Sequence, residues 1–459
     1  MAIALSRSAM QWAHNETTLS GWGNYPDLPT ELLTPLQMTA IPRCVAGRSG
    51  VIARGAGRAY GDAAVGAGCT VSLRSLNRMR HFDPETRELT VEAGVTIAEI
   101  LDCFAPRGLF LKVVPGTKFV TIGGAIAADV HGKNHHRDGG FGTIVKSLRL
   151  AVAGGDILSC SRTENAEVFF ATVGGMGLTG VIVEATIELC PIETSWLRQQ
   201  TRVAENLDAA MRELDDSASS TYSVAWIDCL ARGPALGRSL IFRAEHATPR
   251  DRDTLGPGRE TFAPARAARL SVPDVFPVNL LNRGAVRVFN ELYFRRGASG
   301  AHTPQLVHWD PYFFPLDAVA NWNRLYGPRG FVQHQCVIPM ESGRRVIADI
   351  LDRVSRRGDA SFLAVLKQLG DGAGLMSFPL RGYTLTMDFP VTESLLSFLD
   401  ELDGIVVAAG GRLYLAKDAR QSRKTFEAGY PALGAFRDMR RQSGAGSRFA
   451  SHLSARLGI

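Results

Sequence analysis

The sequence lacks the features that mark membrane-spanning and secreted proteins. It has no apolar run of about eighteen residues, and its N-terminus has no basic start followed by an apolar core. Its seven cysteines never form a C-x-x-C pair, and an odd number at wide spacing is poor material for a disulfide framework. These absences predict a protein of a reducing compartment.

The sequence also has no large excess of charge of one sign. The chain has 51 Lys and Arg against 45 Asp and Glu, and its net charge of +6 is spread along the sequence. A nucleic-acid-binding protein would show a tighter stripe of basic residues, so we expect no nucleic-acid partner. A modest positive field suits an anionic ligand or an anionic membrane surface.

The chain is long enough for more than one hydrophobic core, because it has 459 residues. From about residue 40 to 190, short β-branched runs alternate with glycine, and Thr96 followed by Glu99 makes a capping box that begins one helix. From 196 to 411, apolar residues recur at helical spacing between strand-like runs. These patterns predict an α+β protein whose second sheet is covered by helices.

The change of pattern near residue 196 predicts a domain boundary. We assign residues 1–195 to a first domain and 196–411 to a second. Residues 246–277 are rich in proline, glycine and charge, which predicts a mobile loop that we extend over about 246–300. A passive linker agrees equally well with this composition.

Three glycine-rich turns lie between the predicted strands of the first domain. The stretch "RGAGRAYGD" has the spacing G-x-G-x-x-x-G, which misses the dinucleotide-binding fingerprint by one residue. The stretches "PGTKFVTIGGAIAADVHGKNHH" and "ATVGGMGLTG" supply the other two turns. Glycine lets a ligand approach the backbone, and consecutive amides can hold a diphosphate. Three such turns in one unit suggest a long ligand, because a single phosphate would need only one.

These turns resemble the FAD-binding half of the vanillyl-alcohol-oxidase superfamily of flavoproteins. Five further stretches resemble the branch of that family that oxidises lipid-linked ribose: "DVHGKNHH", "LSVPDVFP", "WNRLYGPRGF", "SFLAVLKQLG" and "GGRLYLAKDAR". The similarity extends from about Gly21 to Leu453. It implies a PCMH-type FAD-binding domain, a cap or substrate domain with an antiparallel sheet covered by helices, and a final segment, 412–459, that returns to the FAD-binding domain.

The resemblance also implies which residues bind FAD. They are Ala53, Arg54, Gly55, Ala56, Gly57, Arg58, Ala59, Tyr60, Gly61, Asp62, Gly116, Thr121, Ile122, Gly123, Gly124, Ala128, His131, Gly132, Ile182 and Tyr414. Some family members attach FAD covalently through a histidine in the first loop. Arg58 stands at that position here and cannot form the bond, so the resemblance implies noncovalent FAD.

Lys417 and His131 are the catalytic residues that the resemblance implies. Oxidation of an alcohol by flavin leaves the hydride to the cofactor and needs a protein group for the hydroxyl proton. A partly desolvated Lys417 can accept that proton, or stabilise an alkoxide if it is charged. Without the resemblance, it would be interpreted as a surface lysine after a strand. His131 could orient the hydroxyl or contact the flavin, and Lys133 could bind a phosphate as a point charge.

A metal site is not expected at His131, His135 and His136. Adjacent histidines without a cysteine or a nearby series of carboxylates do not present the geometry that zinc requires.

Two predicted strands of the second domain carry polar side chains on one face. Gln333 and Gln335 share one face of their strand, and Thr384, Thr386 and Asp388 share one face of theirs. This arrangement suits a sugar pocket, and a half-solvated sheet is the alternative. The substrate-binding residues that the resemblance implies are Tyr60, Lys133, Trp226, Phe313, Gln333, Gln335, Lys367, Thr384 and Thr386.

Three of these positions depart from the family pattern. The lipid-linked ribose oxidases typically have Asn, Cys and Tyr where this chain has Thr384, Thr386 and Phe313. The flavin chemistry is compatible with these exchanges, but they bear on the identity of the substrate.

The resemblance implies FAD-dependent oxidation of a sugar hydroxyl, at C2′ of a polyprenyl-phosphoryl ribose. The 2′-keto product would be an intermediate in epimerisation to the arabinose form for the cell envelope, with a separate NAD(P)-dependent reductase as partner. One alternative is an FAD oxidase of a free alditol or sugar lactone, although such members more often carry the histidine of covalent attachment. Another is a flavoprotein scaffold without turnover.

The implied lipid substrate bears on location. A chain that handles a polyprenyl lipid without a membrane span works at the membrane surface, so we expect a protein that is cytoplasmic or peripheral at the inner face. The apolar and basic segment Pro273–Arg296 is the predicted contact with the membrane.

Overall fold

Two sheets form the first half of the chain in the computed structural model, which describes residues 12–265, 270–273, 283–358 and 363–459. The smaller sheet has the strand order β1-β2-β4-β3, and it contains β1 (Trp12–Leu19), β2 (Leu28–Pro35), β3 (Val51–Arg54) and β4 (Cys69–Ser72). In it, β1 and β2 are antiparallel, whereas β4 runs parallel to both of its neighbours.

The larger sheet of this half has the order β5-β6-β10-β8-β9, and β7 also pairs with β10. Its strands are β5 (Met79–Asp83), β6 (Glu88–Glu92), β7 (Leu109–Leu111), β8 (Val145–Ala151), β9 (Ile157–Ser161) and β10 (Val181–Pro191). The helices of this half are α1 (Ile41–Val45), α2 (Ile97–Phe104), α3 (Ile122–Ala127), α4 (His135–Asp138) and α5 (Ala166–Thr172).

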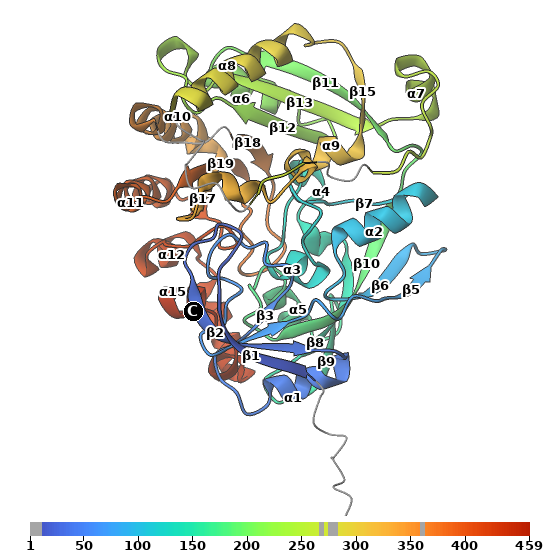
Figure 1. Cartoon of the computed structure of the whole chain (residues 1–459), viewed down its shortest axis with the longest axis vertical. Helices are drawn as coiled ribbons and strands as arrows, with labels where there is room; N and C mark the ends of the chain where they lie inside the picture. Colours follow the sequence, from blue (N-terminus) through green and yellow to red (C-terminus); the bar gives the residue numbers. More distant parts are fainter. Residues whose placement is uncertain (1–11, 266–269, 274–282, 359–362) are drawn as a thin grey trace, which may run out of the picture.

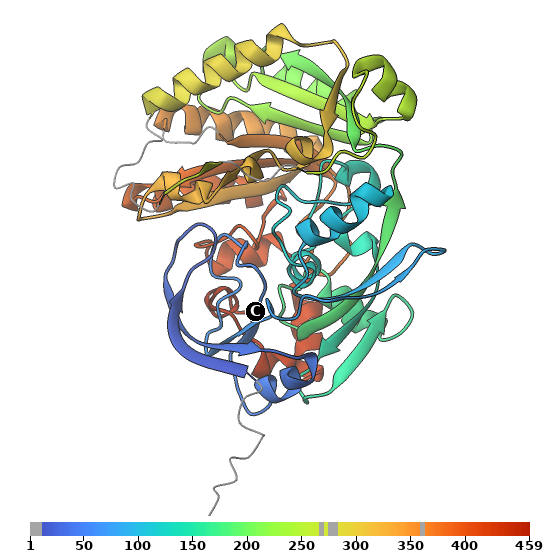
Figure 2. The same ribbon diagram turned by 45° about the vertical axis from the view of Figure 1, so that its right-hand side comes forward.

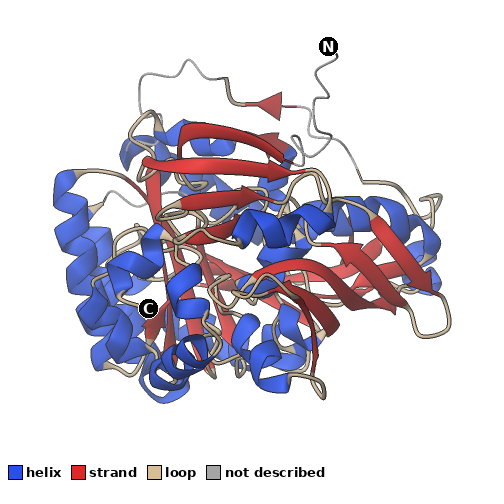
Figure 3. Ribbon diagram, turned by 90° about the horizontal axis from the view of Figure 1, so that it is seen from below, coloured by secondary structure: helices blue, strands red, loops and turns tan. Residues whose placement is uncertain are grey.

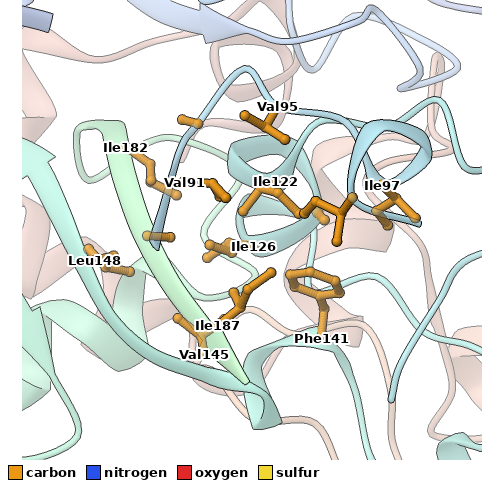
Figure 4. Close-up of a cluster of buried hydrophobic side chains, with 14 of the residues drawn as sticks. Val91, Val95, Ile97, Ile122, Ile126, Phe141, Val145, Leu148, Ile182 and Ile187 are labelled. Atoms are coloured by element: carbon orange, nitrogen blue, oxygen red, sulfur yellow. The ribbon is translucent and has the colours of Figure 1, made fainter. Parts of the chain in front are cut away.

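A cluster of buried aliphatic side chains joins the larger sheet to α2 and α3. Figure 4 shows Val91 and Ile182 of the sheet facing Ile122 and Ile126 of α3, with Phe141 beside them. All five are buried, so their apolar surface stabilises the packing of α3 on the sheet. The second and third glycine turns are therefore attached to a fixed support.

The capping box predicted at Thr96 is confirmed. Thr96 Oγ1 accepts a hydrogen bond from the Glu99 backbone N–H at 3.2 Å, and the Glu99 carboxylate accepts one from the Thr96 N–H at 2.6 Å. Gly108 lies in the left-handed region, with φ of 76°, and it terminates the helical segment that follows α2.

An eight-stranded antiparallel sheet forms the second domain. Its order is β15-β11-β13-β12-β18-β19-β17-β20. The strands are β11 (Trp196–Ala204), β12 (Tyr222–Ile227), β13 (Ser239–His246), β15 (Gln305–His308), β17 (Phe331–Pro339), β18 (Ala364–Leu369), β19 (Gly382–Pro390) and β20 (Arg412–Leu413). Two short strands, β14 (Leu270–Ser271) and β16 (Val319–Ala320), pair separately.

Helices cover one face of this sheet. The helices α6 (Leu207–Asp215), α10 (Met340–Arg357) and α11 (Glu393–Ala408) cluster with the apolar side chains of alternate strand residues, such as Leu366 and Leu385. The intervening residues, such as Lys367 and Thr386, lie on the opposite face, because successive strand side chains alternate. Figures 1 and 2 show this domain stacked on the first along the long axis, and Figure 3 shows strands and helices intermixed. The predicted α+β class is confirmed.

The segment predicted as a loop over about 246–300 contains regular structure. Helices α7 (Pro249–Leu255) and α8 (Arg283–Ser299) lie within it, and α9 (Trp309–Phe313) follows. Helix α7 begins at a capping box, with Thr248 at the N-cap and Asp251 at the third position, a signal that was present in the sequence. Residues 266–269 and 274–282 of this segment lie outside the described residues.

The last part of the chain packs against the first domain. Helices α12 (Arg423–Gly429), α13 (Leu433–Gln442), α14 (Ala445–Arg448) and α15 (His452–Leu457) follow β20. Phe436 and Leu453 share a buried cluster with Ile52 and Leu178, and Phe449 forms a β-bridge with Val51. Figure 1 shows these helices in red beside the blue strands of the N-terminal half.

A buried ion-pair group anchors α15. The Arg456 guanidinium pairs with Asp62 at 2.8 Å and with Asp418 at 3.0 Å, and both carboxylates are buried. The two acidic residues come from segments far apart in the sequence, so one arginine holds three segments together. Loss of that arginine would leave the buried Asp62 without a cation and Asp418 with the charge of Arg420 alone.

We predict that Arg456→Gln lowers the free energy of unfolding by about 3–5 kcal/mol, because a buried charge left without its partner is strongly destabilising. Urea unfolding followed by circular dichroism measures this change. Arg353→Gln is the matched control, since Arg353 pairs with Asp349 on the exposed surface of α10 and should cost less than about 1 kcal/mol. Equal losses for the two variants would contradict the anchoring role.

Candidate active site

A cavity of about 580 Å³ lies between the two domains. The glycine turns of the first domain line one side, and the open face of the second-domain sheet lines the other. A volume of this size and a mainly apolar lining with a few polar groups are typical of cofactor and substrate sites. The final segment contributes as well, through Tyr414, Ala416 and Lys417.

Small residues from all three glycine turns border the cavity. Of the residues predicted to bind FAD, those that line it are Ala53, Gly55, Ala56, Gly57, Arg58, Ala59, Tyr60, Gly116, Thr121, Gly123, Gly124, Ala128, His131, Gly132, Ile182 and Tyr414. The third turn contributes Met176, Gly177 and Gly180, which the prediction did not include.

Two of these glycines have specific backbone requirements. A Cβ at Gly55 would lie 2.1 Å from Thr121 Oγ1, so only glycine lets the first and second turns approach so closely. Gly57 has φ of 65°, in the left-handed region that favours glycine. Gly116 differs from both, since a Cβ there would meet no protein atom within 4 Å and would occupy open space at the cavity wall.

Three residues that were predicted to bind the cofactor make contacts outside the cavity. Arg54 donates to the Ser20 carbonyl at 2.8 Å and lines a separate hollow beside the cavity. Gly61 lies against the Asp418 backbone, where a Cβ would be 2.1 Å from its carbonyl oxygen. Asp62 forms the ion pair that anchors α15. None of the three lines the cavity.

Ile122 and Thr384 also lie away from the cavity lining. Ile122 is fully buried in the core of the first domain, because it is on the face of α3 that packs against the sheet. Thr384 is fully buried behind Gln335, whose side-chain Nε2 donates to Thr384 Oγ1 at 3.3 Å. Thr384 therefore supports a lining residue without reaching the cavity itself.

The remaining residues predicted to bind substrate line the cavity together. They are Tyr60, Lys133, Trp226, Phe313, Gln333, Gln335, Lys367 and Thr386. Sequence reasoning missed several others, among them Trp22, Val365, Asp317 and Trp322. Val365 could have been found, because it shares a strand face with Lys367 on β18.

His131 is buried and makes one polar contact within the described residues. Gln335 Nε2 donates to His131 Nε2 at 2.9 Å. Burial is the main cause that lowers the pKa of His131 well below its usual value, and the nearby charge of Lys367 acts in the same direction. A neutral ring that accepts at Nε2 carries its proton on Nδ1, and that buried donor has no partner among the described groups.

Three lysines surround the same cavity. Burial, with the charge of Lys367, lowers the pKa of Lys133 to about 7. Burial lowers the pKa of Lys367 to about 8. Lys133 donates to the Tyr312 carbonyl, and its Nζ lies 4.2 Å from the centre of the Tyr312 ring. Such a cluster is stabilised by an anion, because each bound negative charge offsets the repulsion among the cations.

Lys417 lies where the first domain meets the final segment. Its Nζ is 3.6 Å from the centre of the Tyr60 ring, a cation–π contact. The Tyr60 backbone N–H donates to the Ala416 carbonyl at 2.9 Å. The backbone of the first glycine turn is therefore hydrogen-bonded to the residue that precedes Lys417. Burial lowers the pKa of Lys417, and the Lys367 charge lowers it further, whereas the Asp388 carboxylate raises it.

No group of three or more His, Cys, Asp and Glu side chains in the described ranges could hold a metal ion. His135 is buried instead and accepts a hydrogen bond from the Gly370 backbone N–H at 3.0 Å. Burial lowers the pKa of this histidine to about 3, with the Lys367 and His136 charges as smaller causes. His136 contacts the Ser220 carbonyl at 3.0 Å. These contacts give both histidines structural partners.

Comparisons with known proteins place this chain in a family. Residues 38–161 match the family described as FAD binding domain. The chain is 38% identical over 96% of its length to the decaprenylphosphoryl-β-D-ribose oxidase of Mycolicibacterium smegmatis, and the match covers 97% of that protein.

Two other relatives are more distant. A Streptomyces coelicolor protein, named by its place in the mprA 5′ region, is 34% identical over 80% of this chain and 100% of its own length. The L-gulonolactone oxidase of Mus musculus is 31% identical over 35% of this chain and 37% of its own.

The protein is therefore an FAD-dependent oxidoreductase. Within that class, the chain belongs to the family of the decaprenylphosphoryl-β-D-ribose oxidase. The cavity suits FAD, because its glycine turns let a long ligand approach the backbone and the buried His131 Nδ1–H is an available donor.

We predict that Gly116→Val weakens FAD binding by about tenfold or more without unfolding the protein, because its side chain would enter the cavity and not the core. Fluorescence titration of the flavin-free protein with FAD measures the affinity, and thermal unfolding of that protein checks the fold. Gly404→Val is the control, since Gly404 is exposed on α11 and a Cβ there also meets no atom within 4 Å. Unchanged FAD affinity in Gly116→Val would mean that the cofactor does not pass this turn.

Proposed function

We propose that the protein oxidises the C2′ hydroxyl of a polyprenyl-phosphoryl ribose to the 2′-keto product. The observation that carries the proposal is the grouping of Lys133, Lys367 and Lys417 around one cavity that the FAD-binding turns also line. The relative with 38% identity is named for a decaprenylphosphoryl ribose, a substrate with both a sugar hydroxyl and a phosphate. A buried cationic cluster beside amide side chains suits that pair of groups.

Lys417 is the proposed base of the reaction. FAD, when bound, accepts the hydride from the carbon that carries the hydroxyl. The O–H proton passes to Lys417 Nζ as the C=O bond forms, so the electron pair of the C–H bond and the proton have separate acceptors. Burial favours the neutral amine that this step requires.

His131 and the sheet amides position the sugar in this proposal. The hydrogen bond from Gln335 fixes the His131 ring with its Nδ1–H free to donate to a bound group. Gln333 adds an amide on the same wall of the cavity. Lys133 and Lys367 supply positive charge for the phosphate, which would in turn favour their protonated forms.

Noncovalent FAD is part of the proposal. Arg58 lines the cavity in the first turn, and its guanidinium lies 3.9 Å from the centre of the Trp22 ring. A guanidinium in this position offers a contact to the cofactor but no linkage. The flavin should therefore be released when the protein is denatured in acid.

A free alditol or sugar lactone is the second candidate substrate. The lactone oxidase relative supports it only over 35% of this chain. Thr386 and Phe313 line the cavity and depart from the family pattern, so the substrate-binding wall is the part of the site that could differ. Anaerobic flavin reduction screened with lipid-linked ribose and with free sugars separates the two candidates.

We predict that Lys417→Gln keeps its flavin but lowers the rate of anaerobic flavin reduction by about 10²–10⁴-fold, the usual effect of losing a general base. Stopped-flow absorbance with the lipid-linked ribose measures this rate. Lys424→Gln is the control, because Lys424 is exposed on α12. A normal rate in the Lys417 variant would exclude this lysine as the base.

A separate NAD(P)-dependent reductase is the proposed partner. Oxidation at C2′ removes the stereochemistry of that carbon, and delivery of a hydride to its opposite face produces the epimer. The second step requires a hydride donor, whereas the flavin is the hydride acceptor of the first step. This difference supports a second protein.

Contact with a membrane surface is also proposed, through helix α8. In the described residues, no helix is long and apolar enough to cross a bilayer. On α8, Val288 and Leu292 are 61% and 63% exposed, while Phe289 and Tyr293 line the cavity. Figure 1 shows α8 at the outer end of the second domain. The helix thus connects the cavity to an exposed apolar surface, which would suit the polyprenyl chain of the substrate.

Basic side chains accompany this surface. Arg287, Arg295 and Arg296 are exposed on α8, and the only acidic residue of the helix is Glu291. Glu291 is paired with Arg238 at 2.8 Å and with Arg295 at 2.5 Å. Apolar and cationic residues together favour an anionic lipid surface. The part of the predicted contact at residues 274–282 lies outside the described residues.

We predict that Val288→Glu with Leu292→Glu reduces flotation with vesicles of anionic phospholipid by at least about tenfold, because two carboxylates would have to enter the interface. Leu36→Glu is the matched control, since Leu36 is 56% exposed but lies on the first domain. Flavin reduction by a short-chain, soluble form of the substrate should be unchanged in both proteins. Equal flotation of the two proteins would exclude α8 as the contact.

A further inference from the structure

One segment of the second domain, residues 309–326, contacts the cofactor turns of the first domain. It contains α9, β16 and two short 3₁₀ helices, Pro315–Ala318 and Trp322–Tyr326. Figure 1 shows α9 where the second domain faces the first. Four residues of this segment line the cavity that the glycine turns also line, and they are Pro315, Leu316, Asp317 and Trp322. Residues 309–326 are called the clasp segment below.

Asp317 joins the clasp segment to the second glycine turn. The Thr117 hydroxyl donates to Asp317 Oδ1 at 2.8 Å, and the Lys118 backbone N–H donates to Oδ2 at 2.8 Å. Both donors directly follow Gly116, which borders the open space of the cavity. A buried carboxylate is stable only when hydrogen-bond donors replace its hydration. The carboxylate and the turn therefore hold each other in place.

A second acidic residue of the clasp segment binds the same turn. Lys118 Nζ pairs with Asp310 at 2.5 Å, and the two side chains are only 10% and 15% exposed. Lys118 is thus held through its backbone by Asp317 and through its side chain by Asp310. A largely buried ion pair is costly to separate, because each charge would be left without its partner.

The first glycine turn is also connected to the clasp segment, through Trp22. Asn323 Nδ2 donates to the Trp22 carbonyl at 3.1 Å, and the Trp22 N–H donates to the Ala59 carbonyl at 2.7 Å. The Trp22 ring lies 5.9 Å from the Trp322 ring and 3.9 Å from the Arg58 guanidinium. One segment of the second domain is therefore linked to two of the turns that carry predicted FAD-binding residues.

These contacts bear on how a noncovalent cofactor is kept in its site. A ligand enclosed between two domains leaves when the walls around it separate. The clasp segment forms part of one wall, and its direct hydrogen bonds to the second turn are those of Asp317. Movement of this wall away from the turn requires those hydrogen bonds to break.

We propose that Asp317 retains FAD, because its two hydrogen bonds hold the clasp segment against the second glycine turn and must break before FAD is released. Asp317 is a positioning residue, since it acts through Thr117 and Lys118. The inference rests on the noncovalent FAD of the proposed function, which acid release tests separately. It requires no particular substrate.

The rate of FAD release from the holoenzyme tests the proposal. The holoenzyme is diluted until FAD dissociates, and the change in flavin fluorescence gives the release rate. Asp317→Ala removes both acceptors and should release FAD about tenfold faster or more, because hydrogen bonds to a carboxylate are among the stronger ones. Asp317→Asn should fall between Asp317→Ala and the unaltered protein, since its amide can replace both hydrogen bonds without the charge.

Changes at Thr117 test the same contact from the first domain. Thr117→Val removes one of the two hydrogen bonds and should accelerate release about threefold or more. Thr117→Ser keeps the hydroxyl and should release FAD at the rate of the unaltered protein. The double variant Thr117→Val with Asp317→Ala should match Asp317→Ala alone, because the hydrogen bond from Thr117 is already lost in that variant.

Asp228→Asn is the matched control for a general loss of stability. Asp228 is a buried carboxylate of the second domain that pairs with Arg238 at 2.7 Å and does not line the cavity. Its loss should lower the thermal stability but leave the rate of FAD release unchanged. Equal acceleration in Asp228→Asn and Asp317→Ala would mean that release follows stability and would overturn the proposal.

The remaining outcomes also decide the question. Unchanged release in Asp317→Ala and Thr117→Val, or effects that multiply in the double variant, would overturn the proposal. If Asp317→Ala does not fold, Thr117→Val and Thr117→Ser still test the contact, because they leave the carboxylate in place. If lipid-linked ribose does not reduce the flavin, the proposed substrate is wrong, whereas the release rates still decide the role of Asp317. A flavin that acid does not release would exclude both noncovalent FAD and this role.

Discussion

The burial of positive charge around one cavity is the constraint on which the rest of the structure depends. Lys133, Lys367 and Lys417 are drawn from three separate parts of the chain, and each would be more stable in water. They are held together because the two domains and the final segment close over them. The aromatic rings of Tyr60 and Tyr312 lie against the Nζ atoms of Lys417 and Lys133, and such contacts offset part of the cost when these groups are charged. A site of this kind is incomplete until an anion and a cofactor occupy it.

The same constraint explains why the two domains contribute different groups to the cavity. Glycine turns on the first domain expose backbone to the cavity, and they are supported by α3 and the core beneath it. The second domain offers alternate side chains from one face of a sheet, whose other face is packed with helices. A rigid sheet can hold amides and lysines at fixed positions with little loss of entropy on binding. Helix α8 is the element of that domain that joins the cavity to an exposed apolar surface.

Local patterns in the sequence predicted the parts of the fold that depend on local chemistry. The capping box at Thr96 and the alternation of Gln333 and Gln335 follow from backbone geometry, which the sequence carries directly. The burial of Asp388 could not be predicted, because a polar strand face is buried or solvated according to what packs against it. The same holds for Arg54, whose contact with Ser20 turns it from the cavity. Resemblance to a family supplied candidate residues, but only the structure distinguishes those that line the cavity from those that support it.

The place of Lys417 in the chain has a consequence for biosynthesis. Residues 1–411 contain the glycine turns and every strand of the helix-covered sheet except β20, yet the proposed base and Tyr414 follow them. Tyr414 donates its hydroxyl to the Ala128 carbonyl at 2.9 Å, so this late segment also ties the second glycine turn in place. During translation, most of the residues that line the cavity therefore emerge from the ribosome before the proposed base. On the proposed mechanism, a nascent chain cannot begin turnover until the segment that carries Lys417 has joined the two domains.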